Sequence, residues 1–369
     1  MVTQSMKLFR VHGIDIYLHP SWWLIFILLS YSLSSSFFPQ NYPNQAPLMY
    51  WFMALLSAIL LFTSVLLHEL MHSLVARAHG INVESIMLFF FGGVASLPKE
   101  DMEPRTEIAM AASGPLFSLL LAGAVYLIHL QAIPLFFKAV TSYIWQLNLI
   151  LAIFNMVPGY PLDGGRVFRA LLMLYYKDLK KATRIASGFG KFFGGVLLFF
   201  GFFAILVGTI QGLWFILIGA FIWFIAKSSY ENVVLKDVLA KIPLSTVTDQ
   251  KYISLSPHDS MGKVIDLYKK TDYGTFIVEK QKRLLGIVDI KKSPALSPAL
   301  WNTIVVLDIM IPADKLQVPS QGTAYDALKL MEEQHMGMLP VVVKGKIKGV
   351  VHRRRIEHVL ALEMKYGAR

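Results

Sequence analysis

The sequence predicts a polytopic α-helical membrane protein with six transmembrane helices and a membrane-associated β-hairpin, followed by a soluble α/β domain pair. Two observations support this fold class. Hydrophobic residues make up 55% of the 369 residues and charged residues only 16%, whereas soluble domains are about 25% charged. From Lys227 onward the apolar runs give way to charged, mixed α and β sequence. We therefore expect a membrane domain at 1–228, a linker at 229–243 and soluble domains at 244–296 and 304–364.

Six apolar segments approach the roughly 20 residues that a helix needs to cross a bilayer. The first is expected to be retained, because no small-residue cleavage site follows it. The connections 39–47 and 131–137 carry no Lys or Arg, whereas the loop expected at 166–184 carries six basic residues. Since basic loops stay in the cytoplasm, we expect a multi-pass plasma-membrane protein whose N-terminus, active-site side and soluble domains are cytoplasmic. The expected spans are 22–38, 50–76, 108–130, 138–157, 187–207 and 213–226.

A His-Glu-x-x-His sequence lies in the second expected span, at His68, Glu69 and His72. Residues four apart share one face of a helix, so both imidazoles can reach one metal ion with Glu69 beside them. Arg77 marks the cytoplasmic end of this span, and a rise of about 1.5 Å per residue puts His68 roughly 13 Å below that end. The alternative is that the two histidines only pack between helices and that Glu69 has no role beside them. Ionisable groups in hydrocarbon are costly, however, and are functional by default.

An apolar stretch at 86–97 is too short to cross the membrane and is broken by Gly92 and Gly93. A Gly-Gly pair between apolar runs is a hairpin signal. We expect a re-entrant or interfacial β-hairpin whose edge could pair with an extended peptide. A plain loop is the alternative.

The end of the fourth expected span, at 155–165, contains two prolines and three glycines and must break the helix. Irregular backbone at membrane depth is tolerated where it is buried in protein or lines a cavity, so Asp163 is a candidate for that cavity. A catalytic zinc has three protein ligands and one open position. The chain has no cysteine, and its other histidines lie before, beyond or at the outer ends of the spans. Asp163 is therefore the best candidate for the third ligand.

The soluble half repeats itself at an interval of 63 residues, which pairs Gly286 with Gly349 and Gly274 with Gly337. In each copy a capped helix leads into two short strands. The expected helices are 260–270 and 323–334, and the expected strands are 275–279, 284–289, 339–343 and 347–351.

This half resembles a pair of cystathionine-β-synthase-type (CBS) domains, most clearly at 306–310, 327–328, 339–342 and 349–351. Such pairs are regulatory modules that often bind adenine nucleotides, so the resemblance implies a nucleotide site and a dimer through the pair. The Thr and Asp that usually follow the last strand are replaced by Asp289 and Lys292 in the first copy, and by His352 and Arg355 in the second. The basic run 353–355 either contacts phosphates or forms a solvated face near the membrane.

Residues 1 to about 228 resemble site-2 proteases, the intramembrane zinc metalloproteases of the peptidase M50 type, and the CBS pair is typical of one branch of that family. The residues that carry the resemblance are His68-Glu69-x-x-His72, the Gly92-Gly93 hairpin, Ser113-Gly114-Pro115 and Asn155-x-x-Pro158-x4-Asp163-Gly164. One departure is Ser118, where many members carry Asn. We expect Ser118 to affect helix packing rather than chemistry.

The resemblance implies a zinc metalloendopeptidase with one Zn²⁺ per chain on His68, His72 and Asp163, and with Glu69 as the general base. Its substrate would be a membrane-anchored regulatory protein, cut within or near a transmembrane segment. Residues implied to bind the substrate are Asn155, Gly92 and Gly93. The CBS pair would regulate this activity.

Three other classes of function compete with this interpretation. The net charge of +11 is a feature of nucleic-acid-binding proteins, but anionic lipid headgroups and orientation in the bilayer explain it more simply, so we expect no nucleic acid. A CBS-regulated transporter or channel with a coincidental His-Glu-x-x-His predicts polar residues spread over several spans. A non-catalytic membrane scaffold predicts no bound zinc.

Overall fold

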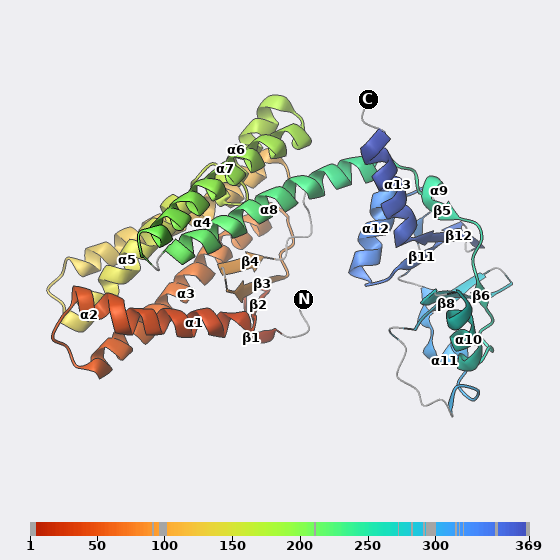
Figure 1. The fold of residues 1–369 in the computed structure, drawn as a ribbon, viewed down its shortest axis with the longest axis horizontal. Helices are drawn as coiled ribbons and strands as arrows, with labels where there is room; N and C mark the ends of the chain where they lie inside the picture. The colour runs from red at the N-terminus through yellow and green to blue at the C-terminus, as the bar shows by residue number, and fades with distance from the viewer. Residues whose placement is uncertain are drawn as a thin grey trace. The chain divides into compact units, whose positions relative to one another are not determined.

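In the computed structural model, the structure describes residues 5–90, 92–95, 102–209, 212–271, 273–281, 283–290, 292, 300–313, 316, 318–319, 321–343 and 346–366. The chain divides into two compact units, Met1–Glu231 and Asn232–Arg369 (Figure 1). Residues 91 and 96–97 of the expected hairpin lie outside the described residues, as do 293–296 at the end of the first expected soluble domain.

The prediction of six membrane-spanning helices is confirmed, since six described helical segments are long and apolar enough to cross a bilayer. One shorter helix, α6 (Asp163–Tyr176), stands between the fourth and fifth of them. The six are α1 (Ser21–Ser32) continued by a π-helical turn (Leu33–Phe37) and α2 (Phe38–Asn41), then α3 (Pro47–Ala78), α4 (Pro104–His129), α5 (Leu135–Asn155), α7 (Leu179–Leu206) and α8 (Gly212–Leu239).

The outer faces of these helices carry large apolar side chains that are exposed in the isolated chain. Leu120 is 65% exposed, and Phe199 and Phe224 are each 67% exposed. Exposed large apolar side chains occur on all six spanning segments, which is not expected of a soluble protein. Lipid chains therefore cover these side chains, as the membrane assignment requires.

The prediction of a loop at 166–184 was wrong, because most of that segment is helical. α6 extends to Tyr176, and α7 begins at Leu179. The Asp178 carboxylate caps α7 by accepting a hydrogen bond from the Lys181 backbone N–H, at 3.0 Å. Lys and Arg are good helix formers, so the basic residues that mark a membrane boundary can form the first turns of a helix.

Two strands before the first span and two strands after the second span form one four-stranded sheet. Its strands are β1 (Met6–Val11), β2 (Ile14–Leu18), β3 (Ser85–Phe89) and β4 (Gly92–Ala95), in the order β1-β2-β3-β4. The expected hairpin is confirmed as β3 and β4, which pair antiparallel with Leu88 opposite Gly93. The glycine pair begins β4, so it lies in a strand and not in the turn.

The second unit contains the repeated helices and strands that the sequence predicts. Its helices are α9 (Leu244–Val247), α10 (Met261–Thr271), α11 (Val306–Ile309), α12 (Ala324–Glu333) and α13 (Arg353–Tyr366). Its strands are β5 (Thr248–Asp249), β6 (Ser254–Leu255), β7 (Thr275–Lys280), β8 (Arg283–Asp289), β9 (Ile311–Pro312), β10 (Val318–Pro319), β11 (Met338–Val343) and β12 (Lys346–His352). They form one sheet in the order β10-β11-β12-β8-β7-β6, with β5 on β12 and β9 on β8.

The helix of each copy of the repeat is hydrogen-bonded at its start to a residue that precedes the other copy in the sequence. The Ala324 N–H, at the start of α12, donates to the carbonyl of Ile242, which precedes the first copy. The Met261 N–H, at the start of α10, donates to the carbonyl of Ile304, which precedes the second copy. Leu239, the last residue of α8, is fully buried in the core around α12. The sixth spanning helix therefore ends inside the packing of the second copy.

Candidate metal and catalytic site

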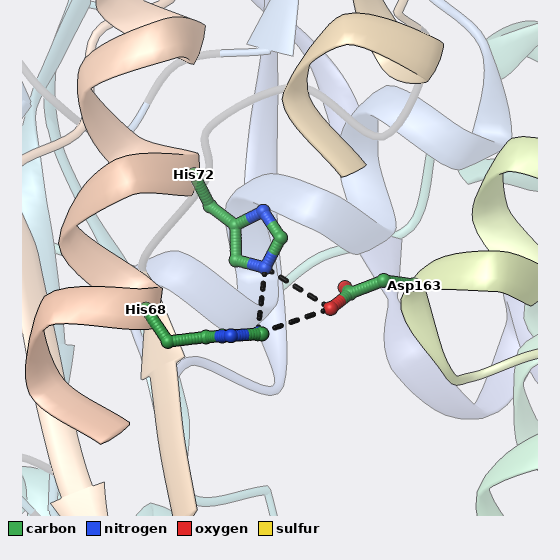
Figure 2. Close-up of side chains that lie close together, drawn as sticks. All are labelled: His68, His72 and Asp163. Atoms are coloured by element: carbon green, nitrogen blue, oxygen red, sulfur yellow. Dashed lines mark hydrogen bonds and ion pairs between the residues drawn. The ribbon is translucent and has the colours of Figure 1, made fainter. Parts of the chain in front are cut away.

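Two histidines of α3 face each other across one turn of helix. His68 and His72 are 3% and 7% exposed, and their ring centres lie 4.8 Å apart at an interplanar angle of 83°. Their Nε2 atoms are 3.1 Å apart (Figure 2). This is the arrangement expected for residues four apart on one helix.

A carboxylate from a distant helix completes the cluster. Asp163, the first residue of α6, places Oδ2 at 3.1 Å from Nε2 of His68 and at 3.1 Å from Nε2 of His72 (Figure 2). One possible ligand atom from each of the three residues lies within 4.8 Å of the other two, so the three residues could hold one metal ion. Two imidazole nitrogens and one carboxylate oxygen are a donor set that Zn²⁺ accepts. Their spacing is close to the roughly 3.4 Å between tetrahedral ligands about 2.1 Å from zinc.

The break before α6 positions Asp163 through close backbone contacts. A Cβ at Gly164 would overlap the Met156 carbonyl oxygen, and one at Gly165 would overlap the backbone of Gly159. The Tyr160 N–H also donates to the carbonyl of Ala186 in α7, at 3.1 Å. Glycine at these positions lets the loop fold tightly against α6 and α7, which fixes where α6 begins.

The outer nitrogens of both imidazoles face α4. His72 Nδ1 donates to the carbonyl oxygen of Met110 at 2.7 Å, and His68 Nδ1 lies 2.9 Å from Ser118 Oγ. Ser118 was expected to affect helix packing rather than chemistry, and that expectation did not include the contact of its hydroxyl with a candidate ligand. A signal was present in the sequence, since Met110, Gly114 and Ser118 recur every four residues on one face of α4.

Gly114 lies where α4 meets the two imidazoles. A Cβ built on Gly114 would lie 2.7 Å from His68 Nε2 and would overlap His72 Nε2. The small residues at 113–115 were expected to permit close helix contact. At Gly114 that contact is made with the candidate metal ligands themselves.

The strand β4 passes the side chain of Glu69. A Cβ on Gly93 would overlap Glu69 Cγ and lie 3.1 Å from its Cδ, so only glycine allows this approach without a shift of Glu69. Gly92, with φ +132°, has no such neighbour within 4 Å. Asn155, the last residue of α5, is half-buried and begins the loop that leads to Asp163.

A buried ion pair joins α4 to α6. Arg169 Nε lies 3.1 Å from Glu107 Oε1, and Arg169 Nη2 contacts the same oxygen. Glu107 is 4% exposed and Arg169 is 7% exposed. The Arg169 guanidinium also lies 4.9 Å from the centre of the Tyr160 ring. Because removing one partner of a buried pair typically costs about 3–5 kcal/mol, this contact holds the helix of Asp163 against the helix that supports the histidines.

Family models and known relatives match most of the chain. The model of peptidase family M50 matches residues 56–136 and 131–198, and the CBS domain model matches residues 244–292 and 306–362. A provisionally named zinc metalloprotease of Synechocystis sp. is 33% identical over 96% of this chain and 95% of its own. A zinc metalloprotease of Methanocaldococcus jannaschii is 29% identical over 98% of each chain. The solved structure of a site-2 protease from the same organism covers 61% of this chain and 94% of its own, with 31% identity and a TM-score of 0.43.

His68 and His72 lie in the spanning helix α3, and Asp163 begins the short helix α6 beside them. Together with relatives named zinc metalloproteases, this site indicates an intramembrane metalloprotease. The chain belongs to the site-2 protease family, peptidase family M50, with a C-terminal CBS pair. Membership favours a protease over the transporter and scaffold alternatives.

Proposed function

We propose that this chain is a zinc endopeptidase that cuts membrane-anchored regulatory proteins within or near their transmembrane segments. The observation that carries the proposal is the convergence of His68 Nε2, His72 Nε2 and Asp163 Oδ2. We propose that the protein lies in the plasma membrane, with its N-terminus, active-site side and CBS pair in the cytoplasm. The six basic residues of 166–184 support this orientation, because basic segments beside spanning helices stay in the cytoplasm.

In this proposal His68, His72 and Asp163 hold one Zn²⁺ per chain. Zinc bound there supplies Lewis-acid polarisation of the scissile carbonyl and a water of lowered pKa. Glu69 accepts the proton of the attacking water at its carboxylate and returns it to the leaving amine. The hydroxyl of the water forms the new C–O bond as the C–N bond breaks, so the products are a carboxylate and an amine.

The ligand assignment predicts that Asp163→Asn lowers zinc affinity by more than about 100-fold, beyond the 10–100-fold cost of outer-shell changes. An amide is a poorer and uncharged ligand. Metal analysis of purified protein should find about one zinc per wild-type chain and little in the variant. The matched control is Asp178→Asn, an exposed carboxylate at the α7 N-cap, where Asn caps equally well. Full zinc content in Asp163→Asn would remove Asp163 from the site.

Among the described residues, β4 is an edge strand of the sheet, and its outer edge is the proposed binding surface for an unwound substrate. The carbonyl of Leu88 accepts from the His19 N–H at 2.9 Å, so the backbone groups of Leu88 point toward β2. Gly93, opposite Leu88, then points its own N–H and C=O away from β3, toward the free edge. A substrate strand paired there would lie beside Glu69. Asn155 is proposed to bind substrate backbone nearby.

The edge proposal predicts that Ala95→Pro raises the KM for substrate by roughly 2–10-fold, the equivalent of one hydrogen bond of about 0.5–1.5 kcal/mol. Ala95 shares the outward orientation of Gly93, so proline removes a free-edge N–H and spares the β3 ladder. Steady-state cleavage and zinc content check this result. Val94→Ala, at a side chain that is 55% exposed, is the control. An unchanged KM in Ala95→Pro would count against edge pairing.

We propose that an adenine nucleotide at the CBS pair regulates cleavage, with domains at 244–296 and 304–364 and a dimer through the pair. The burial of Leu239 of α8 against the second copy supports this proposal. Arg353 pairs with Glu332 and Glu357 at 3.2 and 3.1 Å, which leaves Arg354 and Arg355 as the candidates for phosphate contact.

The regulatory proposal predicts a change in the cleavage rate of the full chain when saturating ATP or AMP is added. The same assay on Arg354→Ala/Arg355→Ala should show a weaker response, because two phosphate contacts are lost. An identical rate with and without nucleotide, together with no binding heat in calorimetry, would contradict regulation by nucleotide. Light scattering of the full chain reports the dimer.

A further inference from the structure

One face of α4 supports both histidines of the proposed metal site. We define this histidine face by Met110, Gly114 and Ser118, which lie one turn apart, about 6 Å along the helix axis. Met110 and Ser118 contact the two Nδ1 atoms, and Gly114 touches both rings between them. The partner of His72 Nδ1 is a carbonyl oxygen and the partner of His68 Nδ1 is a hydroxyl, so the two partners differ in whether they can donate a hydrogen bond.

The partner of His72 allows only one tautomer. A backbone carbonyl accepts and cannot donate, so His72 must carry its proton on Nδ1 to bond the Met110 oxygen at 2.7 Å. Neutral His72 then leaves the lone pair of Nε2 free on the side of Asp163.

The partner of His68 allows both tautomers. A serine hydroxyl accepts or donates by rotation, and Ser118 Oγ lies 2.9 Å from His68 Nδ1. When Ser118 donates, His68 carries its proton on Nε2 and donates it to Asp163 Oδ2 at 3.1 Å. When Ser118 accepts, His68 Nε2 has a free lone pair. The donating orientation of Ser118 therefore gives the His68 ring a hydrogen bond on both sides.

We propose that Ser118 is a positioning residue for His68, with a hydroxyl that accepts from Nδ1 when metal is held and donates to Nδ1 when it is not. The inference rests on the proposed zinc site. Ser118 is fully buried, at 0% exposure, so bulk water does not replace its hydroxyl. Outer partners of this kind orient metal-ligating histidines and raise their basicity.

The test compares Ser118→Ala with Ser57→Ala in the full-length protein. Ser57 is also 0% exposed, lies on the helix that carries His68, and its hydroxyl has no hydrogen-bond partner within the described residues. Each variant therefore loses one fully buried hydroxyl from the bundle. Thermal unfolding of the metal-free proteins shows whether both variants fold.

Zinc affinity by chelator competition should fall about 10–100-fold in Ser118→Ala and stay at the wild-type value in Ser57→Ala. The visible absorption of the Co²⁺-loaded protein, which reports the ligand field of the metal, should change only in Ser118→Ala. A folded Ser118→Ala with wild-type zinc affinity and an unchanged Co²⁺ spectrum would overturn the inference and leave the zinc site standing. A wild-type chain that binds no zinc would overturn the proposed function, and this inference with it.

Discussion

Glu69→Gln is expected to slow peptide hydrolysis by about 10²–10⁴-fold, the usual contribution of a general base, while the protein keeps its zinc. Glutamine has nearly the same shape as glutamate but cannot accept the proton of the attacking water. The neighbouring ligands His68 and His72 keep their contacts with Asp163 and α4. Cleavage of a single-span substrate in proteoliposomes measures the rate, and metal analysis of the same sample measures the zinc.

Glu84→Gln is the matched control, because Glu84 is an exposed carboxylate shortly after α3. This control should cleave at the wild-type rate. Undiminished hydrolysis by Glu69→Gln would remove Glu69 from the chemistry, and loss of zinc from Glu69→Gln would mean that Glu69 is needed to hold the metal.

Gly114→Ala is expected to remove most of the zinc, although it changes no proposed ligand. Its methyl group would lie 2.7 Å from His68 Nε2 and overlap His72 Nε2, which displaces both rings. We expect zinc affinity to fall by at least the roughly 10–100-fold seen when outer partners are lost, and cleavage to fall with it. Chelator competition on purified protein measures the affinity.

Gly123→Ala is the control on the same helix, since a Cβ at Gly123 meets nothing within 4 Å. Both variants gain the same helix propensity, up to about 1 kcal/mol, so the difference between them isolates the contact with the imidazoles. Zinc affinity in Gly114→Ala equal to that in Gly123→Ala would show that the histidine face of α4 does not constrain the site.

The parts of the site that sequence could predict follow from local rules. His68 and His72 share a helix face because they are four residues apart, and Pro158 and Pro161 had to end the fourth span before Asp163. Charge counting then placed these groups on one side of the membrane. The geometry agrees, since Asp163 Oδ2 lies 3.1 Å from both imidazoles.

The parts that sequence could not predict depend on contacts between distant segments. Ser118 lies 50 residues from His68. The four-residue spacing of Met110, Gly114 and Ser118 indicates that they share one face of α4, but it does not indicate that this face meets His68. Gly93 was taken as a hairpin signal, although its lack of a side chain also serves the close approach to Glu69. The parallel pairing of β2 with β3 likewise joins strands separated by two spanning helices.

The most direct test of the account is to map the new chain ends made from a single-span substrate by the purified protein and by Glu69→Gln. New termini are expected within or next to the apolar segment for the wild type, and at a rate at least about 10²-fold lower for Glu69→Gln. Termini confined to soluble regions far from the membrane, or the same termini formed equally fast by Glu69→Gln, would contradict an intramembrane protease that uses Glu69 as its general base.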